Sequence, residues 1–336
     1  MARPFFALIA AALALLSSAG GGAPGPARAP SAFRADTSLF DIHAGFWPNL
    51  HHFLYATARA ERGLDSGRFV AARALADTVG FGALSARDQR TWRAAVAWYD
   101  SALAARDILF DAGMVDSDDR IAALDDDETP GDARLPPALA AVLERAAPVY
   151  RRLWWPAHDS ADRRWLERER SLLARYGAGL TAQEQRLFRE PWPEVPIRVD
   201  VTAYANWAGA YTSTDPAHVT VSSEDPAAQD DDGLEVLFHE VLHTVDDSLF
   251  DGLQSAFFAA RKTLPRDATH PFIFYTAGEL VRRAVPGHVP YAEKYGLWSR
   301  SAAFAHARPL LERCWRPYLD GTIPLDEALR RYAAGF

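Results

Sequence analysis

The hydrophobic pattern of this chain changes at Pro191-Trp192-Pro193, and this change limits the possible folds more than any other feature of the sequence. Before it, from about residue 31, hydrophobic residues recur at helical spacing. After it, Ile197, Val199 and Val201 alternate with polar residues, which is typical of a half-buried strand. Helical periodicity then returns from about residue 230 and predominates to the end of the chain.

These patterns predict a mainly α-helical protein with a small β-sheet, an α+β fold. We expect a helical region over residues 30–190 and a second domain over residues 191–336. Further strands are predicted at 210–214 and 218–223. Within the helical region, Thr181 followed three residues later by Glu184 resembles the start of a helix, with Thr181 as its cap.

Residues 1–29 have the pattern of a secretory signal peptide. Arg3 precedes an apolar run from Phe5 to Leu16, which is too short to span a bilayer comfortably, and small residues follow it. Cleavage is expected near Ala19 or after Ala29, and an uncleaved anchor is the alternative. No other segment is apolar for long enough to cross a membrane. The sequence therefore predicts an exported protein, secreted or periplasmic, with no stable membrane span after removal of the signal.

The composition excludes some classes of partner and of stabilisation. The chain has 336 residues, is 49% hydrophobic and carries a net charge of −8. Nothing in it forms the basic patch that nucleic acid binding needs, so we expect no nucleic acid partner. Cys314 is the only cysteine, which excludes an internal disulfide. An exported protein of this kind must rely on its core or on a metal.

The segment Phe238 to Asp247 reads FHEVLHTVDD and lies on a strongly amphipathic helix. At about 100° per residue, one face carries only apolar side chains. These are Leu234, Leu237, Phe238, Val241, Leu242 and Val245. His239, Glu240 and His243 lie on the opposite face with Asp246 and Asp247. That polar face is either solvated or forms the floor of a cleft.

The pattern His-Glu-x-x-His favours the cleft. The imidazoles of His239 and His243 lie one helical turn apart and point the same way, so both can bind one Zn²⁺. Glu240 projects to the side, where it can take a proton from a water at the metal. The pattern also occurs by chance, and the context of sheet, loop and helix supports the zinc interpretation.

Residues 195–285 resemble the gluzincin metallopeptidases, in which this motif is followed by a glutamate ligand on a later helix. The resemblance implies a zincin-like catalytic domain, with His239 and His243 as ligands and Glu240 as general base. The matching third ligand is Glu279 in FYTAGEL, where Gly278 would let a neighbouring backbone come close. Arg282 and Arg283 occupy the turn in which several gluzincins carry a carboxylate, which is a departure from the family pattern.

Other assignments around the metal remain open. Asp246, Asp247 and His270 are alternative third ligands, and the two aspartates could instead orient a ligand histidine. The metzincin class is rejected because it needs Gly and His where this chain has Asp246 and Leu249. An additional donor for the oxyanion is expected from a small group of side chains. The candidates are His270, Tyr275, Tyr291 and Tyr295. The strand predicted at 218–223 resembles the zincin edge strand that pairs with an extended peptide.

The function predicted from the sequence is that of an exported zinc-dependent metallopeptidase that hydrolyses a peptide or protein substrate, with Zn²⁺ as its cofactor. Two other classes compete with this hypothesis. A non-catalytic secreted protein could retain the zinc fold for binding, and a helical binding module could carry the motif by accident. Metal analysis separates the last of these from the others.

Overall fold

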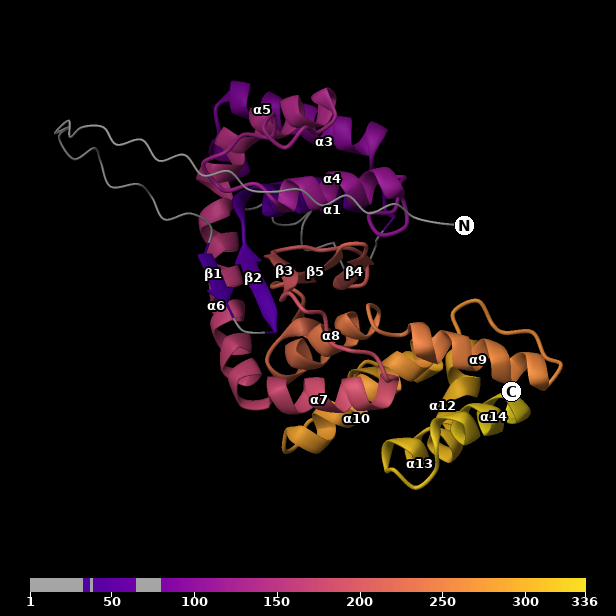
Figure 1. The fold of residues 1–336 in the computed structure, drawn as a ribbon. Helices are drawn as coiled ribbons and strands as arrows, with labels where there is room; N and C mark the ends of the chain where they lie inside the picture. The colour runs from indigo at the N-terminus through magenta and orange to yellow at the C-terminus, as the bar shows by residue number, and fades with distance from the viewer. Residues whose placement is uncertain (1–32, 37–38, 65–79) are drawn as a thin grey trace, which may run out of the picture. The chain divides into compact units, whose positions relative to one another are not determined.

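A five-stranded β-sheet lies between two groups of helices in the computed structural model (Figure 1). Its strands, in the spatial order β1-β2-β3-β5-β4, are β1 (Phe33–Asp36), β2 (Phe40–Ala44), β3 (Ile197–Thr202), β5 (Ala217–Ser222) and β4 (Ala210–Thr214). The three inner strands are parallel, and β1 and β4 each run antiparallel to their neighbour. The mainly helical α+β fold predicted from the sequence is confirmed.

The structure describes residues 33–36, 39–64 and 80–336. The helices before β3 are α1 (Phe46–Glu61), α3 (Ala86–Ala102), α4 (Ala112–Ala122), α5 (Pro137–Leu153), α6 (Trp155–Leu172) and α7 (Ala178–Phe188). Those after β5 are α8 (Asp231–Leu242), α9 (Asp247–Ala259), α10 (His270–Ala284), α11 (Tyr291–Lys294), α12 (Ala302–Cys314), α13 (Arg316–Leu319) and α14 (Leu325–Gly335). The signal peptide predicted over residues 1–29 lies outside the described residues. Among the described helices, none combines the length and the hydropathy that a membrane span requires.

The domain boundary predicted at residue 190 falls inside one compact unit, which covers residues 31–336. The region before the boundary is not purely helical, because it contributes β1 and β2 to the sheet. Phe40 of β2 is the parallel partner of Ile197 of β3, and the pairing continues to His43 and Asp200. The sheet is therefore built from both sides of the predicted boundary.

The two faces of the sheet are covered by different helices. The apolar side chains of β3, including Val199 and Val201, pack with those of α8 in one hydrophobic core. The other face lies toward α1 and α4 (Figure 1), and it carries buried polar residues such as Asp200 and Thr202. The prediction of a half-buried strand is therefore wrong for β3, because α1 and α4 exclude solvent from its polar side.

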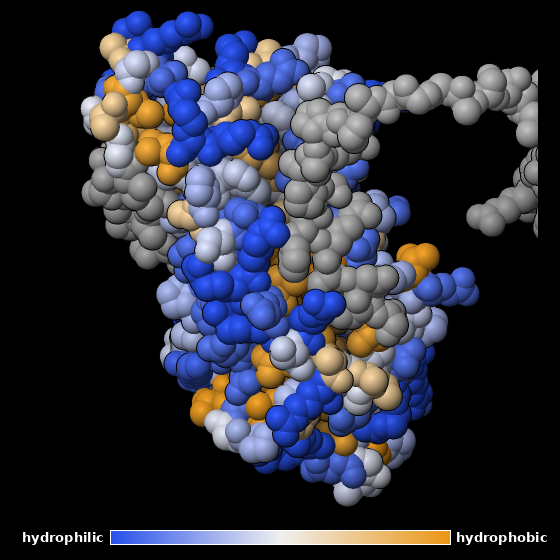
Figure 2. All heavy atoms as spheres, turned by 90° about the vertical axis from the view of Figure 1, so that its left-hand side faces the viewer, coloured by the Kyte–Doolittle hydropathy of each residue, from blue (hydrophilic) through white to orange (hydrophobic). Residues whose placement is uncertain are grey.

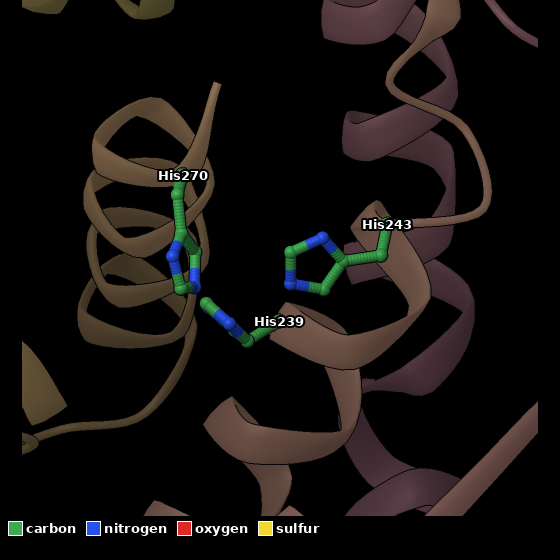
Figure 3. Close-up of side chains that lie close together, drawn as sticks. All are labelled: His239, His243 and His270. Carbon is green, nitrogen blue, oxygen red and sulfur yellow. The ribbon is translucent and has the colours of Figure 1, made fainter. Parts of the chain in front are cut away.

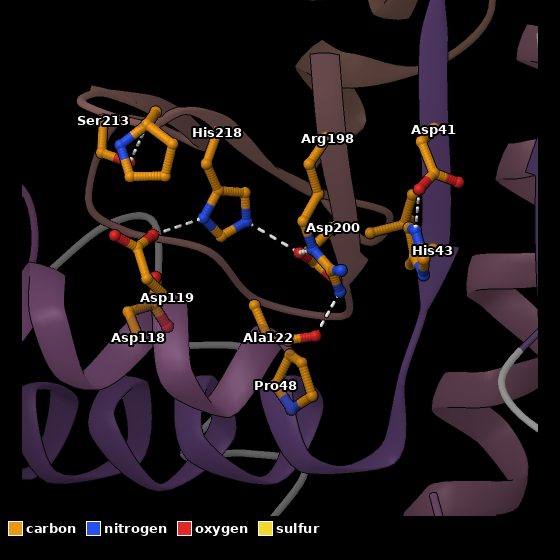
Figure 4. A network of polar contacts seen from close by, with 12 residues as sticks. Asp41, His43, Pro48, Asp118, Asp119, Ala122, Arg198, Asp200, Ser213 and His218 are labelled. Carbon is orange, nitrogen blue, oxygen red and sulfur yellow. Dashed lines mark hydrogen bonds and ion pairs between the residues drawn. The ribbon is translucent and has the colours of Figure 1, made fainter. Parts of the chain in front are cut away.

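A network of charged side chains fills the space between this polar face and α4 (Figure 4). His218 of β5 bonds Asp119 through Nδ1 at 2.8 Å and Asp200 through Nε2 at 2.7 Å. Arg198 donates to the same Asp200 at 2.7 Å. Burial by itself would lower the pKa of His218, but its hydrogen bonds to Asp119 and Asp200 raise that pKa to about 10. His218 is therefore a buried imidazolium that ties α4 to the sheet.

His218 should make stability depend on alkaline pH. Because its folded pKa lies above the unfolded value near 6.5, its contribution is fully present below about pH 6.5 and is lost as pH rises toward 10. We expect His218→Gln to lower the free energy of unfolding by about 3 kcal/mol at pH 6, since one partner of a buried pair is removed. Urea denaturation at pH 6 and pH 10 measures this, and a difference from wild type that is equal at both pH values would contradict it.

The face on the α6 side of the molecule is mostly hydrophilic, with only scattered hydrophobic residues (Figure 2). The exposed residues of α6 include Arg163, Arg164 and Glu167. The buried side of the same helix carries Trp165, whose indole N–H donates to the carbonyl of Ala228 at 2.6 Å. This bond connects α6 with the segment that leads into α8.

Candidate metal centre

Helix α8 presents its apolar residues to the sheet and its polar residues to a cleft, as its periodicity predicts. His239 and Glu240 lie within the helix, and His243 is the first residue after its end. The imidazole rings of His239 and His243 are 5.1 Å apart between centroids. One turn of helix therefore places both rings beside the same volume.

A third imidazole reaches this volume from a different helix. His270 is the first residue of α10, and its ring centroid lies 5.3 Å from that of His239 and 5.2 Å from that of His243. Each of the three residues offers a nitrogen atom, and these nitrogens all lie within 4.8 Å of one another. Figure 3 shows the three rings turned toward a common point. Three histidines are an established ligand set for catalytic Zn²⁺, at about 2.0–2.1 Å from each nitrogen.

The protonation states of this cluster fit a metal site. Burial lowers the pKa of His239 well below its usual value, and the neighbouring His243 and His270 lower it further. Burial lowers the pKa of His243 to about 3, and it also lowers that of His270. The three rings are therefore neutral at pH 7, as metal ligands must be. His239 Nδ1 is buried and has no hydrogen-bond partner in the described part of the chain, so its lone pair is available to a metal.

Glu240 follows His239 on α8, lines the same cleft as the three histidines and contacts the sheet. Its Oε2 atom accepts a hydrogen bond of 2.7 Å from the hydroxyl of Thr212 on β4. Burial raises the pKa of Glu240 to about 7, although the bond from Thr212 acts in the opposite direction. A carboxyl group with a pKa near neutrality can both accept and release a proton, which is the property required of a general base and acid.

The structure does not bring Glu279, the predicted third ligand, into the cluster of three histidines. Glu279 follows His270 by nine residues on α10, which places it about half a turn away around the helix axis, on the opposite face. Its carboxylate accepts a hydrogen bond of 2.6 Å from Nη2 of Arg282 and one of 3.2 Å from Arg316. Arg282, one of the two arginines that depart from the gluzincin pattern, therefore binds Glu279. Gly278 does provide a close approach, since a Cβ there would lie 2.7 Å from Pro290.

The two predicted aspartates do not line the cleft, and no described hydrogen bond joins them to the histidines. Asp246 precedes α9 and its side chain bonds Thr269, next to His270, while burial raises its pKa. Asp247 is exposed. Neither aspartate orients His239, whose Nδ1 is unpaired. The second-sphere role predicted for these aspartates has no described hydrogen bond in its support and stays a prediction.

The three tyrosines predicted as possible donors to the oxyanion differ in whether they line the cleft. The hydroxyl of Tyr275 accepts from Arg316 at 2.9 Å, and the residue does not line the cleft. Tyr295 donates to Asp232 at 2.7 Å and is also outside the lining. Tyr291 does line the cleft. Of the predicted donors, Tyr291 is therefore the one placed near the site, and His270 belongs with the histidine cluster instead.

Sequence reasoning missed Glu235, which lies one turn before His239 on the same face of α8. Its Oε2 contacts His288 Nε2 at 2.5 Å and accepts from the main-chain N–H of Tyr291 at 2.8 Å. These bonds fix the segment that carries Tyr291 into the cleft. The spacing Glu235, His239 and His243, each four residues apart, is the signal that could have identified it.

The cleft has a volume of about 920 Å³, and the three histidines and Glu240 lie in its wall. Residues 206–215, which include all of β4, form another part of the wall. The prediction that the strand at 218–223 is the edge strand is wrong. This strand is β5, which lies between β3 and β4, and β4 forms the edge of the described sheet on this side. Phe110, Trp207 and Phe250 also line the cleft and are at least 42% exposed. Phe110 belongs to the helical region before residue 190, so that region contributes to the cleft.

Comparison with protein-family models, with curated proteins and with solved structures finds no match. The resemblance of residues 195–285 to gluzincins therefore remains a prediction from the motif. What the chain can do must be argued from the site itself.

Proposed function

We propose that this protein is a zinc-dependent metallopeptidase, with His239, His243 and His270 as the ligands and Glu240 as the general base. The observation that carries the proposal is the convergence of three neutral imidazoles beside a buried carboxyl group in the wall of an open cleft. Three protein ligands leave a fourth position of a tetrahedral ion for water or substrate, as catalytic zinc sites require. The third histidine, in place of a glutamate, separates this ligand set from that of the gluzincins.

The metal, Glu240 and Tyr291 have different roles in the proposed reaction. Zn²⁺, when bound, supplies Lewis-acid polarisation of the scissile carbonyl and makes a water more acidic. Glu240 accepts a proton from the attacking water and delivers it to the leaving amine. Tyr291, in the lining of the same cleft, is the candidate to donate a hydrogen bond to the developing oxyanion.

The substrate that best fits the cleft is an extended peptide segment. β4 is the last strand of the sheet, so its outer edge offers main-chain groups to an additional strand. The exposed aromatic side chains Phe110, Trp207 and Phe250 line the same cleft and can contact apolar side chains of the peptide. The proposed reaction is thus hydrolysis within a polypeptide chain that binds along β4.

Metal analysis together with peptide hydrolysis tests the proposal. Protein purified without chelator is expected to contain about one equivalent of zinc and to cleave members of a mixed peptide library, as detected by mass spectrometry. Removal of the metal with a chelator should stop cleavage, and added Zn²⁺ should restore it. Protein without zinc would indicate an accidental motif. Protein with zinc that cleaves no peptide would indicate a binding protein that retains the metal for structure.

A further inference from the structure

Edge strand β4 connects the proposed general base with the helices on the far side of the sheet. Neighbouring residues of a strand point to opposite faces, and here Thr212 and Tyr211 do so. The hydroxyl of Thr212 lies 2.7 Å from Oε2 of Glu240 and 3.0 Å from the main-chain oxygen of the same residue. Both side chains are buried, with 6% of Thr212 and 7% of Glu240 exposed.

Tyr211 anchors the strand from the opposite face. Its hydroxyl contacts Nε2 of His52 on α1 at 2.8 Å and donates to Oδ2 of Asp118 on α4. The ring of Tyr211 packs in the hydrophobic cluster formed largely by α1, α3 and α5. A strand at the edge of a sheet has main-chain bonds on one side only, so these side-chain contacts restrict its position. They hold the main chain of β4 at the point where Thr212 leaves it.

We propose that Thr212 is a positioning residue that sets the orientation of the Glu240 carboxylate for proton transfer. This inference rests on the proposed function of Glu240. With Oε2 fixed by the Thr212 hydroxyl, Oε1 is the oxygen that accepts the proton from water in the cleft. The side-chain hydroxyl of Thr212 is engaged by Glu240 and acts on the reaction only through that residue.

The physical reason is the freedom of a glutamate side chain. Three torsions separate its carboxylate from the main chain, and a general base works only within hydrogen-bond reach of the proton that it abstracts. A bond from a hydroxyl to a charged carboxylate is short and strong, and it selects one orientation. A base held on a regular element by such a contact keeps its geometry better than one placed by its own torsions alone.

Two substitutions of Thr212 distinguish the effect of its hydroxyl from the effect of its side-chain volume. Thr212→Val keeps the volume and removes the bond, so kcat for peptide hydrolysis should fall roughly 10- to 100-fold, with KM and zinc content unchanged. Thr212→Ser restores the hydroxyl and should bring kcat back to within about 3-fold of wild type. The matched control is Thr181→Val on α7, a threonine that is as buried as Thr212 but does not line the cleft, and it should leave kcat unchanged.

Three results would overturn the proposal. These are an unchanged kcat in Thr212→Val, an equal loss in Thr181→Val, and a Thr212→Ser enzyme as slow as the valine variant. Crystal structures provide a readout that needs no turnover. The Glu240 carboxylate should occupy one rotamer in wild type and Thr212→Ser, and it should change or divide its rotamer in Thr212→Val. A wild type that cleaves no peptide would refute the proposed function, and the rotamer comparison would still decide the role of Thr212.

Discussion

Glu240→Gln is expected to lower kcat for peptide hydrolysis on the order of 10²- to 10⁴-fold, because it removes the group that takes the proton from water. The amide has nearly the same shape as the carboxyl group and can still contact the Thr212 hydroxyl, which lies 2.7 Å from Oε2 in wild type. Zinc content should therefore stay near one equivalent. Steady-state kinetics and elemental analysis of the same preparation measure both quantities.

A matched control for this experiment lies on α6. Glu167→Gln makes the same change at an exposed position and should leave kcat and zinc content as in wild type. If Glu240→Gln retains near-normal turnover, the assignment of Glu240 as general base is wrong. If it loses its zinc as well as its activity, Glu240 contributes to the ligand set instead.

The second large effect concerns the third ligand. His270→Ala should weaken zinc binding by roughly 100-fold or more, since loss of a direct ligand costs more than loss of its hydrogen-bond partner. Glu279→Ala should leave zinc affinity within a few-fold of wild type, because Glu279 lies on the opposite face of α10 and binds Arg282 and Arg316. Competition with a chromophoric chelator measures each affinity.

His306→Ala provides the control for loss of an imidazole, because His306 is exposed on α12 and should not affect zinc binding. Glu279→Ala is still expected to lower the free energy of unfolding by about 1–3 kcal/mol, since the bonds from Arg282 and Arg316 to its carboxylate are lost. A large loss of zinc affinity in Glu279→Ala, with none in His270→Ala, would restore the ligand set implied by the gluzincin resemblance.

The parts of the site that lie on one helix were predictable from the sequence. Helical spacing alone places His239, Glu240 and His243 on the face opposite the apolar residues of α8. The third histidine was harder to assign, because the 27 positions from residue 243 to residue 270 include α9 and two turns whose path no local pattern specifies. The two arginines that follow Glu279 were the available sign that its carboxylate had other partners.

The wrong predictions about the fold share a cause. A local sequence pattern does not show which other elements will pack over that segment. The alternation in β3 correctly predicted a strand, but Asp200 is buried because α4 supplies its partners through His218 and Asp119. The predicted cap at Thr181 is wrong, since α7 begins at Ala178 and continues from α6 through the π-helical turn Leu173–Gly177. Thr181 is buried inside that helix.

The pairing of β2 with β3 has a consequence for how the chain acquires its structure. Phe40 and Ile197 are partners in the register, so 197 − 40 = 157 positions separate them. Contacts between such distant positions carry a high loop-closure cost and form slowly compared with local helical contacts. During synthesis, β2 therefore emerges long before β3, whereas α1, α3 and α5 can already pack together. A cleavage near residue 190 would leave two fragments, neither of which contains the complete sheet.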